Sequence, residues 1–149
     1  MGKAVGQYLE DLRRQGCRVF HDILGDGFNI DHVVVSPRGI FVIETKTYSK
    51  SSRGRGVVEF DGERILVNGL EPERNAVRQV RALAARLKHL LAESTGRRFP
   101  VRCVVMFPGW FVENRAKGPS DVWVLNPKGL PAFIEPAEEV PDTFHPPIC

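Results

Sequence analysis

Residues 29–47 read NIDHVVVSPRGIFVIETKT, and this stretch decides the fold of the chain. Two runs rich in β-branched residues, 30–35 and 40–46, predict two strands. The link between them, Ser36-Pro37-Arg38-Gly39, favours a type I turn because proline fixes φ at the first central position. We therefore predict an antiparallel hairpin in which Ser36 pairs with Gly39.

The register of this hairpin brings charged side chains together at its open end. It places Asp31 directly opposite Glu44, and the alternation of side chains along a strand places Lys46 on the same face. Two carboxylates in this position repel each other, because their Cβ atoms are only about 5 Å apart. A divalent cation would remove the repulsion, and Mg²⁺ is commonly bound by one or two carboxylates and water. Lys46 could then orient an attacking water or stabilise charge that develops on a phosphate.

An ordinary ion pair is the alternative explanation for Glu44 and Lys46. The pattern Glu-x-Lys is common on strands, and a salt bridge between the two side chains would account for it without any chemistry. The addition of Asp31, in register and in a hairpin with few other charges, brings the metal hypothesis level with this alternative.

The same residues carry a resemblance to a known family. Asp31, followed by Glu44-Thr45-Lys46 at the end of the next strand, resembles the Asp…Glu-x-Lys signature of the PD-(D/E)XK nuclease superfamily. More narrowly, residues 29–35 and 39–46 resemble the nuclease-related domain, NERD, and the similarity extends over residues 6–91.

This resemblance implies a reaction and a set of residues that perform it. It implies a nuclease that depends on Mg²⁺ or Mn²⁺ and hydrolyses phosphodiester bonds of nucleic acid, with DNA as the expected substrate. Asp31 and Glu44 would bind the metal, assisted by the Thr45 carbonyl, and Lys46 would position water or stabilise the phosphate in the transition state.

Two glutamines bear on the resemblance in opposite ways. NERD sequences commonly carry Gly-Glu in the first helix, where the glutamate assists the metal site, whereas this chain has Gly6-Gln7. An amide can hold a water molecule but supplies no charge. Gln79, in a long helix that we expect from Pro72 to about residue 96, matches by position a glutamine that approaches the site in such sequences. A surface glutamine is the alternative.

Basic residues gather beside the hairpin. Lys50, Arg53 and Arg55 lie in a polar loop, 48–56, which we predict to contact nucleic acid, and the alternative is a linker with incidental charge. Arg86 joins this prediction, because a helix that turns Gln79 toward the metal also turns Asn75 and Arg86 that way.

The remaining pattern predicts an α/β fold in which residues 1–135 form one NERD-like nuclease domain. Its order resembles the αβββαβ core of restriction-endonuclease-like folds, which implies a mixed central sheet flanked by helices. Residues 136–149 are proline-rich, and we expect a poorly ordered tail there. The other expected elements are a helix at 3–15, strands at 17–23, 57–60, 64–67, 101–107 and 122–125, and a loop at 112–120.

Composition sets wider limits on the class of protein. The chain has 149 residues, 42% of them hydrophobic and 26% charged, which fits one globular domain. No apolar run approaches the roughly 20 residues of a membrane span, and the first residues do not resemble a secretory signal. Cys17, Cys103 and Cys149 show no C-x-x-C spacing, so neither a disulfide framework nor a zinc site is indicated. We therefore expect a cytoplasmic protein without a membrane partner.

Three function classes remain open on the sequence. The first is the metal-dependent nuclease. The second is a catalytically inactive nucleic-acid-binding module that retains the nuclease fold, for which Gln7 is the best argument. The third is an interaction domain of a longer, multidomain regulatory protein. A homodimer is compatible with each of them.

Overall fold

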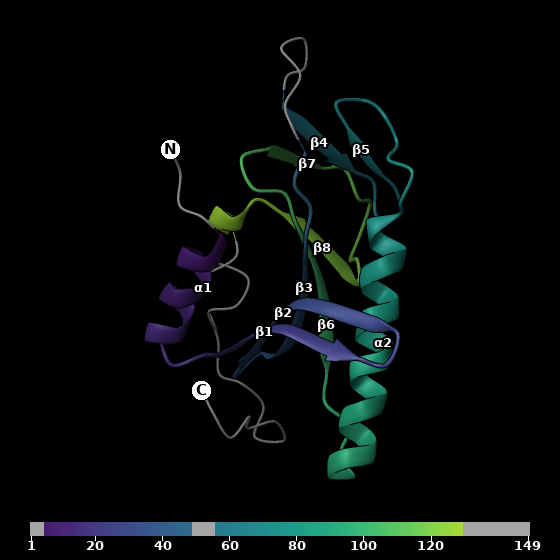
Figure 1. Ribbon diagram of the computed structural model, residues 1–149. Helices are drawn as coiled ribbons and strands as arrows, with labels where there is room; N and C mark the ends of the chain where they lie inside the picture. Colours follow the sequence, from purple (N-terminus) through teal and green to yellow (C-terminus); the bar gives the residue numbers. More distant parts are fainter. Residues whose placement is uncertain (1–4, 49–55, 130–149) are drawn as a thin grey trace.

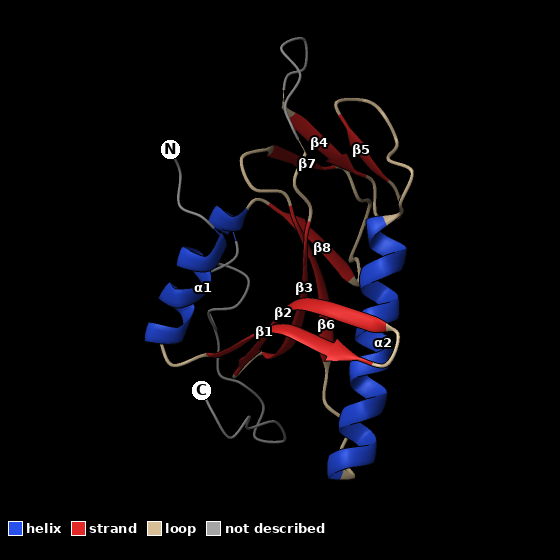
Figure 2. Ribbon diagram, in the orientation of Figure 1, coloured by secondary structure: helices blue, strands red, loops and turns tan. Residues whose placement is uncertain are grey.

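The computed structural model describes residues 5–48 and 56–129, which form two α-helices, eight strands and a short 3₁₀ helix (Figure 1, Figure 2). The predicted tail at 136–149 lies outside these described residues. No helix within them is both long and apolar enough to cross a membrane. The elements are α1 (Val5–Arg14), β1 (Arg18–Gly25), β2 (Phe28–Ser36), β3 (Gly39–Thr45), β4 (Val57–Phe60), β5 (Ile65–Val67), α2 (Ala76–Thr95), β6 (Val101–Met106), β7 (Phe111–Asn114), β8 (Val122–Leu125) and η1 (Pro127–Gly129).

The central sheet has the strand order β1-β2-β3-β6-β8. Strands β1, β2 and β3 are joined by tight turns and pair antiparallel, whereas β6 pairs parallel with both β3 and β8. The parallel pairing of β3 with β6 requires a crossover, and α2 provides it. The predicted α/β class, the mixed sheet and the αβββαβ order are thus confirmed.

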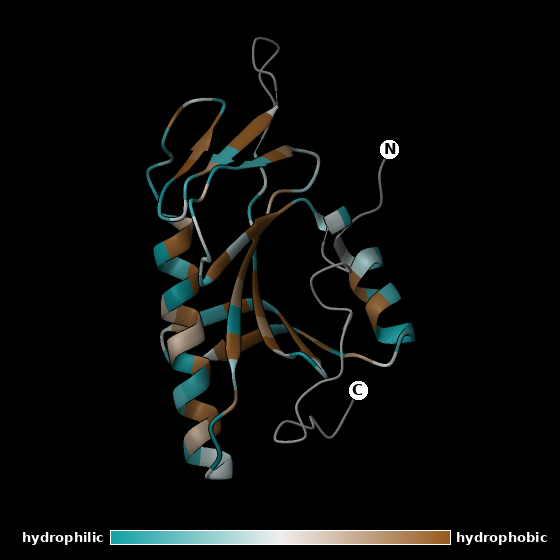
Figure 3. Ribbon diagram, turned by 180° about the vertical axis from the view of Figure 1, so that it is seen from behind, coloured by the Kyte–Doolittle hydropathy of each residue, from teal (hydrophilic) through white to brown (hydrophobic). Residues whose placement is uncertain are grey.

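The two long helices cover opposite faces of this sheet (Figure 1). Val77, Val80 and Leu87 of α2 belong to the core on one face, and Leu9 and Leu12 of α1 belong to the core on the other. The strands between them are largely hydrophobic (Figure 3). Residues 39–43 of β3 are buried, as expected for a strand covered on both faces, and burial becomes partial only from residue 44 onward. Polar groups at this end of β3 are therefore held by a rigid, buried strand.

A second, smaller sheet has the order β5-β4-β7 and lies near the start of α2 (Figure 1). The sequence prediction was wrong for part of it, because residues 112–120 were expected to form a loop. Instead β7 occupies Phe111–Asn114 and pairs parallel with β4, with Val58 opposite Val112. This strand is only four residues long and contains a charged residue, Glu113, so its formation depends on a distant partner.

Helix α2 begins later than the sequence suggested. We expected Pro72 in its first turn, but the helix starts at Ala76, with Asn75 as its N-cap. The side-chain oxygen of Asn75 accepts a hydrogen bond from the backbone N–H of Arg78 at 3.0 Å. This bond satisfies an amide that the first turn leaves without a partner. At the other end Gly96 adopts a left-handed conformation, with φ of 71°, and closes the helix.

Asn75→Ala should therefore lower the free energy of unfolding by about 1 kcal/mol, because alanine cannot accept the hydrogen bond of the cap. Urea unfolding of the two proteins measures the difference. The matched control is Arg78→Ala, which keeps the backbone donor and alters only an exposed side chain. An equal loss of stability in both variants would show that the cap contributes nothing.

Candidate metal and nucleic-acid site

The predicted hairpin register is observed, but the ladder ends one residue before the predicted pair of carboxylates. Strands β2 and β3 pair from Ser36↔Gly39 to His32↔Ile43. Beyond this point a side chain takes over from the backbone, since Oδ2 of Asp31 accepts a hydrogen bond from the N–H of Thr45 at 3.1 Å. Asp31 is thereby fixed at the end of β3, where the two strands separate.

Lys46 links the end of β3 to helix α2. Its Nζ donates a hydrogen bond to Oε1 of Gln79 at 2.8 Å and lies 3.5 Å from Oε1 of Glu44. Its backbone N–H donates to the carbonyl of Met106 at 2.9 Å, which extends the line of β3 along β6. The ion pair that the alternative reading predicted is thus present. It remains open to water, because the Lys46 and Glu44 side chains are 17% and 16% exposed.

Burial raises the pKa of Glu44 above its ordinary value, and the carboxyl group of Asp31 raises it further. Lys46 lowers the same pKa, but its effect is smaller than the sum of the other two. An ionised Glu44 is therefore short of compensating positive charge at this position. A bound cation would supply positive charge at this position.

The donor atoms at this end of β3 fit a hard divalent cation. Asp31 and Glu44 offer carboxylate oxygens, which Mg²⁺ and Mn²⁺ prefer, and Mg²⁺ usually retains several waters beside one or two carboxylates. Within residues 5–48 and 56–129, no group of three or more His, Cys, Asp or Glu could hold a metal, so water would have to complete the coordination. A metal-binding role of the Thr45 carbonyl stays a prediction. The buried hydroxyl of Thr45 has no hydrogen-bond partner among the described residues.

We predicted that Asn75 and Arg86 turn toward the metal site together with Gln79, but the contacts of both side chains lie elsewhere. Asn75 caps the helix, and Arg86 donates from Nη1 to the carbonyl of Asp26 at 3.1 Å while its guanidinium lies 5.2 Å from the centre of the Phe28 ring. Arg86 lies two turns beyond Gln79, about 10 Å along the helix axis, and therefore meets the turn between β1 and β2 rather than the end of β3. Its role in binding nucleic acid stays a prediction.

Other predicted positions lie on a helix of the opposite sheet face or outside the described residues. Lys50, Arg53 and Arg55 belong to residues 49–55, which the structure does not describe. Gln7 lies on α1. The apolar residues of α1 pack against one face of the sheet, and those of α2 pack against the other face. The structure therefore brings together Asp31, Glu44, Lys46 and Gln79.

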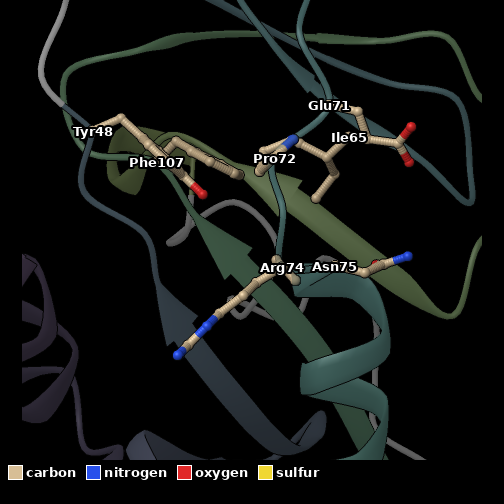
Figure 4. Close-up of a pocket in the computed structure, with 8 residues that line it drawn as sticks. Tyr48, Ile65, Glu71, Pro72, Arg74, Asn75 and Phe107 are labelled. Atoms are coloured by element: carbon tan, nitrogen blue, oxygen red, sulfur yellow. The ribbon is translucent and has the colours of Figure 1, made fainter.

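A pocket lies where β3 and β6 leave the central sheet, and its lining includes Tyr48, Phe107 and residues at the start of α2. Tyr48 follows Lys46 by two residues, and its ring stacks on that of Phe107, with centroids 6.0 Å apart. Figure 4 shows the two rings side by side and the side chains of Arg74 and Asn75 extending in opposite directions from the start of α2. Trp110 fixes the segment, since its Nε1 donates to the carbonyl of Tyr48 at 3.3 Å. The sequence did not predict this aromatic pair, because residues 48 and 107 are 59 positions apart along the chain.

The sequence interpretation also missed the partner of His32. His32 and His21 are direct neighbours across β1 and β2, and their Nδ1 atoms are 2.9 Å apart. A signal was available: Asp26-Gly27 is a two-residue turn, and counting outward from it places residues 21 and 32 opposite each other.

The chain is similar to a known family and to a solved structure over most of its length. A model of the nuclease-related domain family matches residues 2–108. Among solved structures, SfsA of Pyrococcus furiosus in complex with Ca²⁺ is 16% identical, with a TM-score of 0.39, and the match covers 80% of this chain and 54% of that one. The chain thus spans about half the length of SfsA. No curated protein matches the chain.

Proposed function

The chain belongs to the nuclease-related domain family, and from this premise we propose that it is a Mg²⁺- or Mn²⁺-dependent nuclease that hydrolyses phosphodiester bonds of DNA. The observation that carries the proposal is the meeting of four side chains from three elements. Asp31 of β2, Glu44 and Lys46 at the end of β3, and Gln79 of α2 converge through the contacts given above.

Each of the four residues has a distinct role in this proposal. The carboxylates of Asp31 and Glu44 would hold the metal, whose chemistry is to lower the pKa of water and to neutralise phosphate charge. Gln79 holds the ammonium group of Lys46 through its side-chain oxygen. Lys46 is thereby a positioned cation with further N–H donors, available to orient water or to stabilise the phosphate as negative charge develops on it.

The rigidity of the support favours catalysis over simple binding. Asp31 is held by a backbone N–H, Lys46 by both its backbone and its side chain, and β3 is buried immediately before them. Charged groups that are fixed before the substrate arrives need not reorganise during the reaction, and this is the main source of electrostatic catalysis.

Incubation of supercoiled plasmid with the protein tests the proposal. We expect nicking with Mg²⁺ or Mn²⁺, none after addition of a chelator, and none with Asp31→Asn, which keeps an acceptor for the Thr45 N–H but removes the negative charge. Asp26→Asn, in the exposed turn between β1 and β2, is the matched control and should cleave like the wild type. Nicking that survives both the chelator and Asp31→Asn would refute the mechanism, and parallel reactions with RNA test the choice of DNA.

One observation favours a second candidate, a catalytically inactive module that binds nucleic acid. Gln7 stands where the family commonly carries glutamate, and its amide supplies no charge to the carboxylate pair. This candidate predicts retention of DNA in a gel-shift assay at low salt, without nicking under any metal condition.

A further inference from the structure

We propose that His21 and His32 form a second metal site, selective for borderline transition ions such as Ni²⁺, Cu²⁺ or Zn²⁺ and separate from the carboxylate pair. The observation is the approach of their rings, which meet edge-on at an interplanar angle of 90° with Nδ1 atoms 2.9 Å apart. Imidazole nitrogen is a preferred ligand of these ions. The site does not depend on the proposed nuclease activity.

The hairpin brings the two imidazoles together through its backbone. His21 and His32 pair directly in the antiparallel ladder of β1 and β2, so both side chains leave the sheet on the same face. Asp22, the next residue, has a positive φ of 49°, and the ladder resumes only at Ile23↔Ile30. The pair thus lies where the hairpin bends, and the exposed side chain of His21 is accessible from solvent.

The spacing of the two nitrogens matches that of two ligands on one ion. Nitrogens that are each about 2.0–2.1 Å from a metal lie about 2.9 Å apart at a ligand angle of 90°, and about 3.4 Å apart at a tetrahedral angle. The observed 2.9 Å therefore suits Ni²⁺ or Cu²⁺ directly, and Zn²⁺ after a small opening. The remaining positions would be filled by water, since no third His, Cys, Asp or Glu of the described residues completes the group.

The protons balance without any change of charge. In the neutral form of the pair, one imidazole donates its Nδ1–H to the lone pair of the other Nδ1. Binding of one ion to both Nδ1 atoms requires that each ring carry its proton on Nε2, so the shared proton moves to the other nitrogen of its own ring.

Calorimetric titration with NiCl₂ tests the site. The reference protein is the full chain with Asp31→Asn, His145→Ala and Cys149→Ser, which remove one carboxylate of the proposed nuclease site and the histidine and cysteine that lie outside the described residues. Cys17 and Cys103 are buried and need no change. We expect one Ni²⁺ per chain and affinity weakened by more than about tenfold when either His21→Ala or His32→Gln removes one of the two linked ligands. Mg²⁺ should not compete.

His89→Ala is the matched control, because His89 is exposed on α2 and its Nε2 lies 3.1 Å from Oε1 of Glu93. It should bind Ni²⁺ like the reference protein. Electron paramagnetic resonance spectra of bound Cu²⁺ should show hyperfine coupling to two nitrogens. In His21→Ala the coupling should be to one nitrogen. Because His21 is exposed, its removal should leave the fold intact by circular dichroism. Unchanged Ni²⁺ affinity in folded His21→Ala would overturn the proposal and leave the pair as a cross-strand hydrogen bond.

Discussion

Glu44→Gln is expected to abolish metal-dependent cleavage and, in the absence of metal, to raise the melting temperature. The first effect follows from the proposed role of Glu44, since a neutral amide is a much poorer ligand for Mg²⁺ than a carboxylate. The loss should be of the order of a thousandfold or more, comparable to the removal of a main electrostatic contributor to catalysis. The second effect follows from the electrostatics of the protein without metal.

The direction of the stability change comes from the raised pKa of Glu44. Because burial and Asp31 raise this pKa in the folded protein, the folded state binds more protons than the unfolded state as pH rises from the ordinary value of 4.5. Stability therefore falls with rising pH until Glu44 is ionised in the folded protein too. At pH 7 the wild type without metal carries this cost, and Gln removes it. The difference between the two proteins should vanish below the ordinary pKa.

Thermal unfolding with and without Mg²⁺ measures both effects in one series. Mg²⁺ should stabilise the wild type, because it binds the folded state, and should not stabilise Glu44→Gln. The matched control is Glu73→Gln, an exposed carboxylate just before α2, which should leave the melting temperature and the response to Mg²⁺ unchanged. A lower melting temperature for Glu44→Gln in chelator would show that the ion pair with Lys46 outweighs burial and Asp31.

Glu44 is expected to lower stability in the absence of metal and is proposed to serve function. Such an unfavourable arrangement of charges is what made this site detectable in the sequence. The hairpin from Phe28 to Thr45 is local: its turn and its alternation fix the register, and the register placed three charges at one end of an apolar face. An arrangement that repels itself stands out against a pattern that is otherwise consistent with a folded core. The one detail missed was that the ladder stops short and Asp31 bonds to the N–H of Thr45 instead.

Features that depend on distant partners were not predictable in the same way. Strand β7 exists because β4 offers it an edge, and Arg86 lies on Phe28 because the first hairpin reaches α2. Arg81 of α2 is paired with Glu63 at 3.0 Å and with Asp121 at 2.7 Å, and both partners lie on other segments of the chain. In each case the sequence gives the chemistry of the side chain, while its partner is set by the packing of elements that are far apart along the chain.

Lys46→Met is expected to lower the cleavage rate by about 10²–10³-fold while leaving metal binding intact. Methionine keeps an unbranched apolar stem as far as Cε and lacks the ammonium group, which is the donor to Gln79 and the neighbour of Glu44. The loss should appear in kcat rather than in KM, because the proposed charge stabilisation acts in the transition state. Stabilisation by Mg²⁺ should persist, since the variant removes a positive charge from beside the two carboxylates. This response separates Lys46 from Glu44, whose replacement removes both cleavage and the effect of Mg²⁺.

Gln79 supplies the second half of this test because it acts through Lys46. Gln79→Ala leaves the ammonium group in place but removes its 2.8 Å acceptor, so the rate should fall less, by about tenfold, as for a lost positioning contact. Gln79→Glu, which restores an acceptor oxygen, should recover most of the activity. The control is Lys88→Met, a cation on the exposed surface of the same helix. Wild-type kcat in Lys46→Met, under conditions where the metal still binds, would remove Lys46 from the mechanism and leave the ion pair with Glu44 as its whole role.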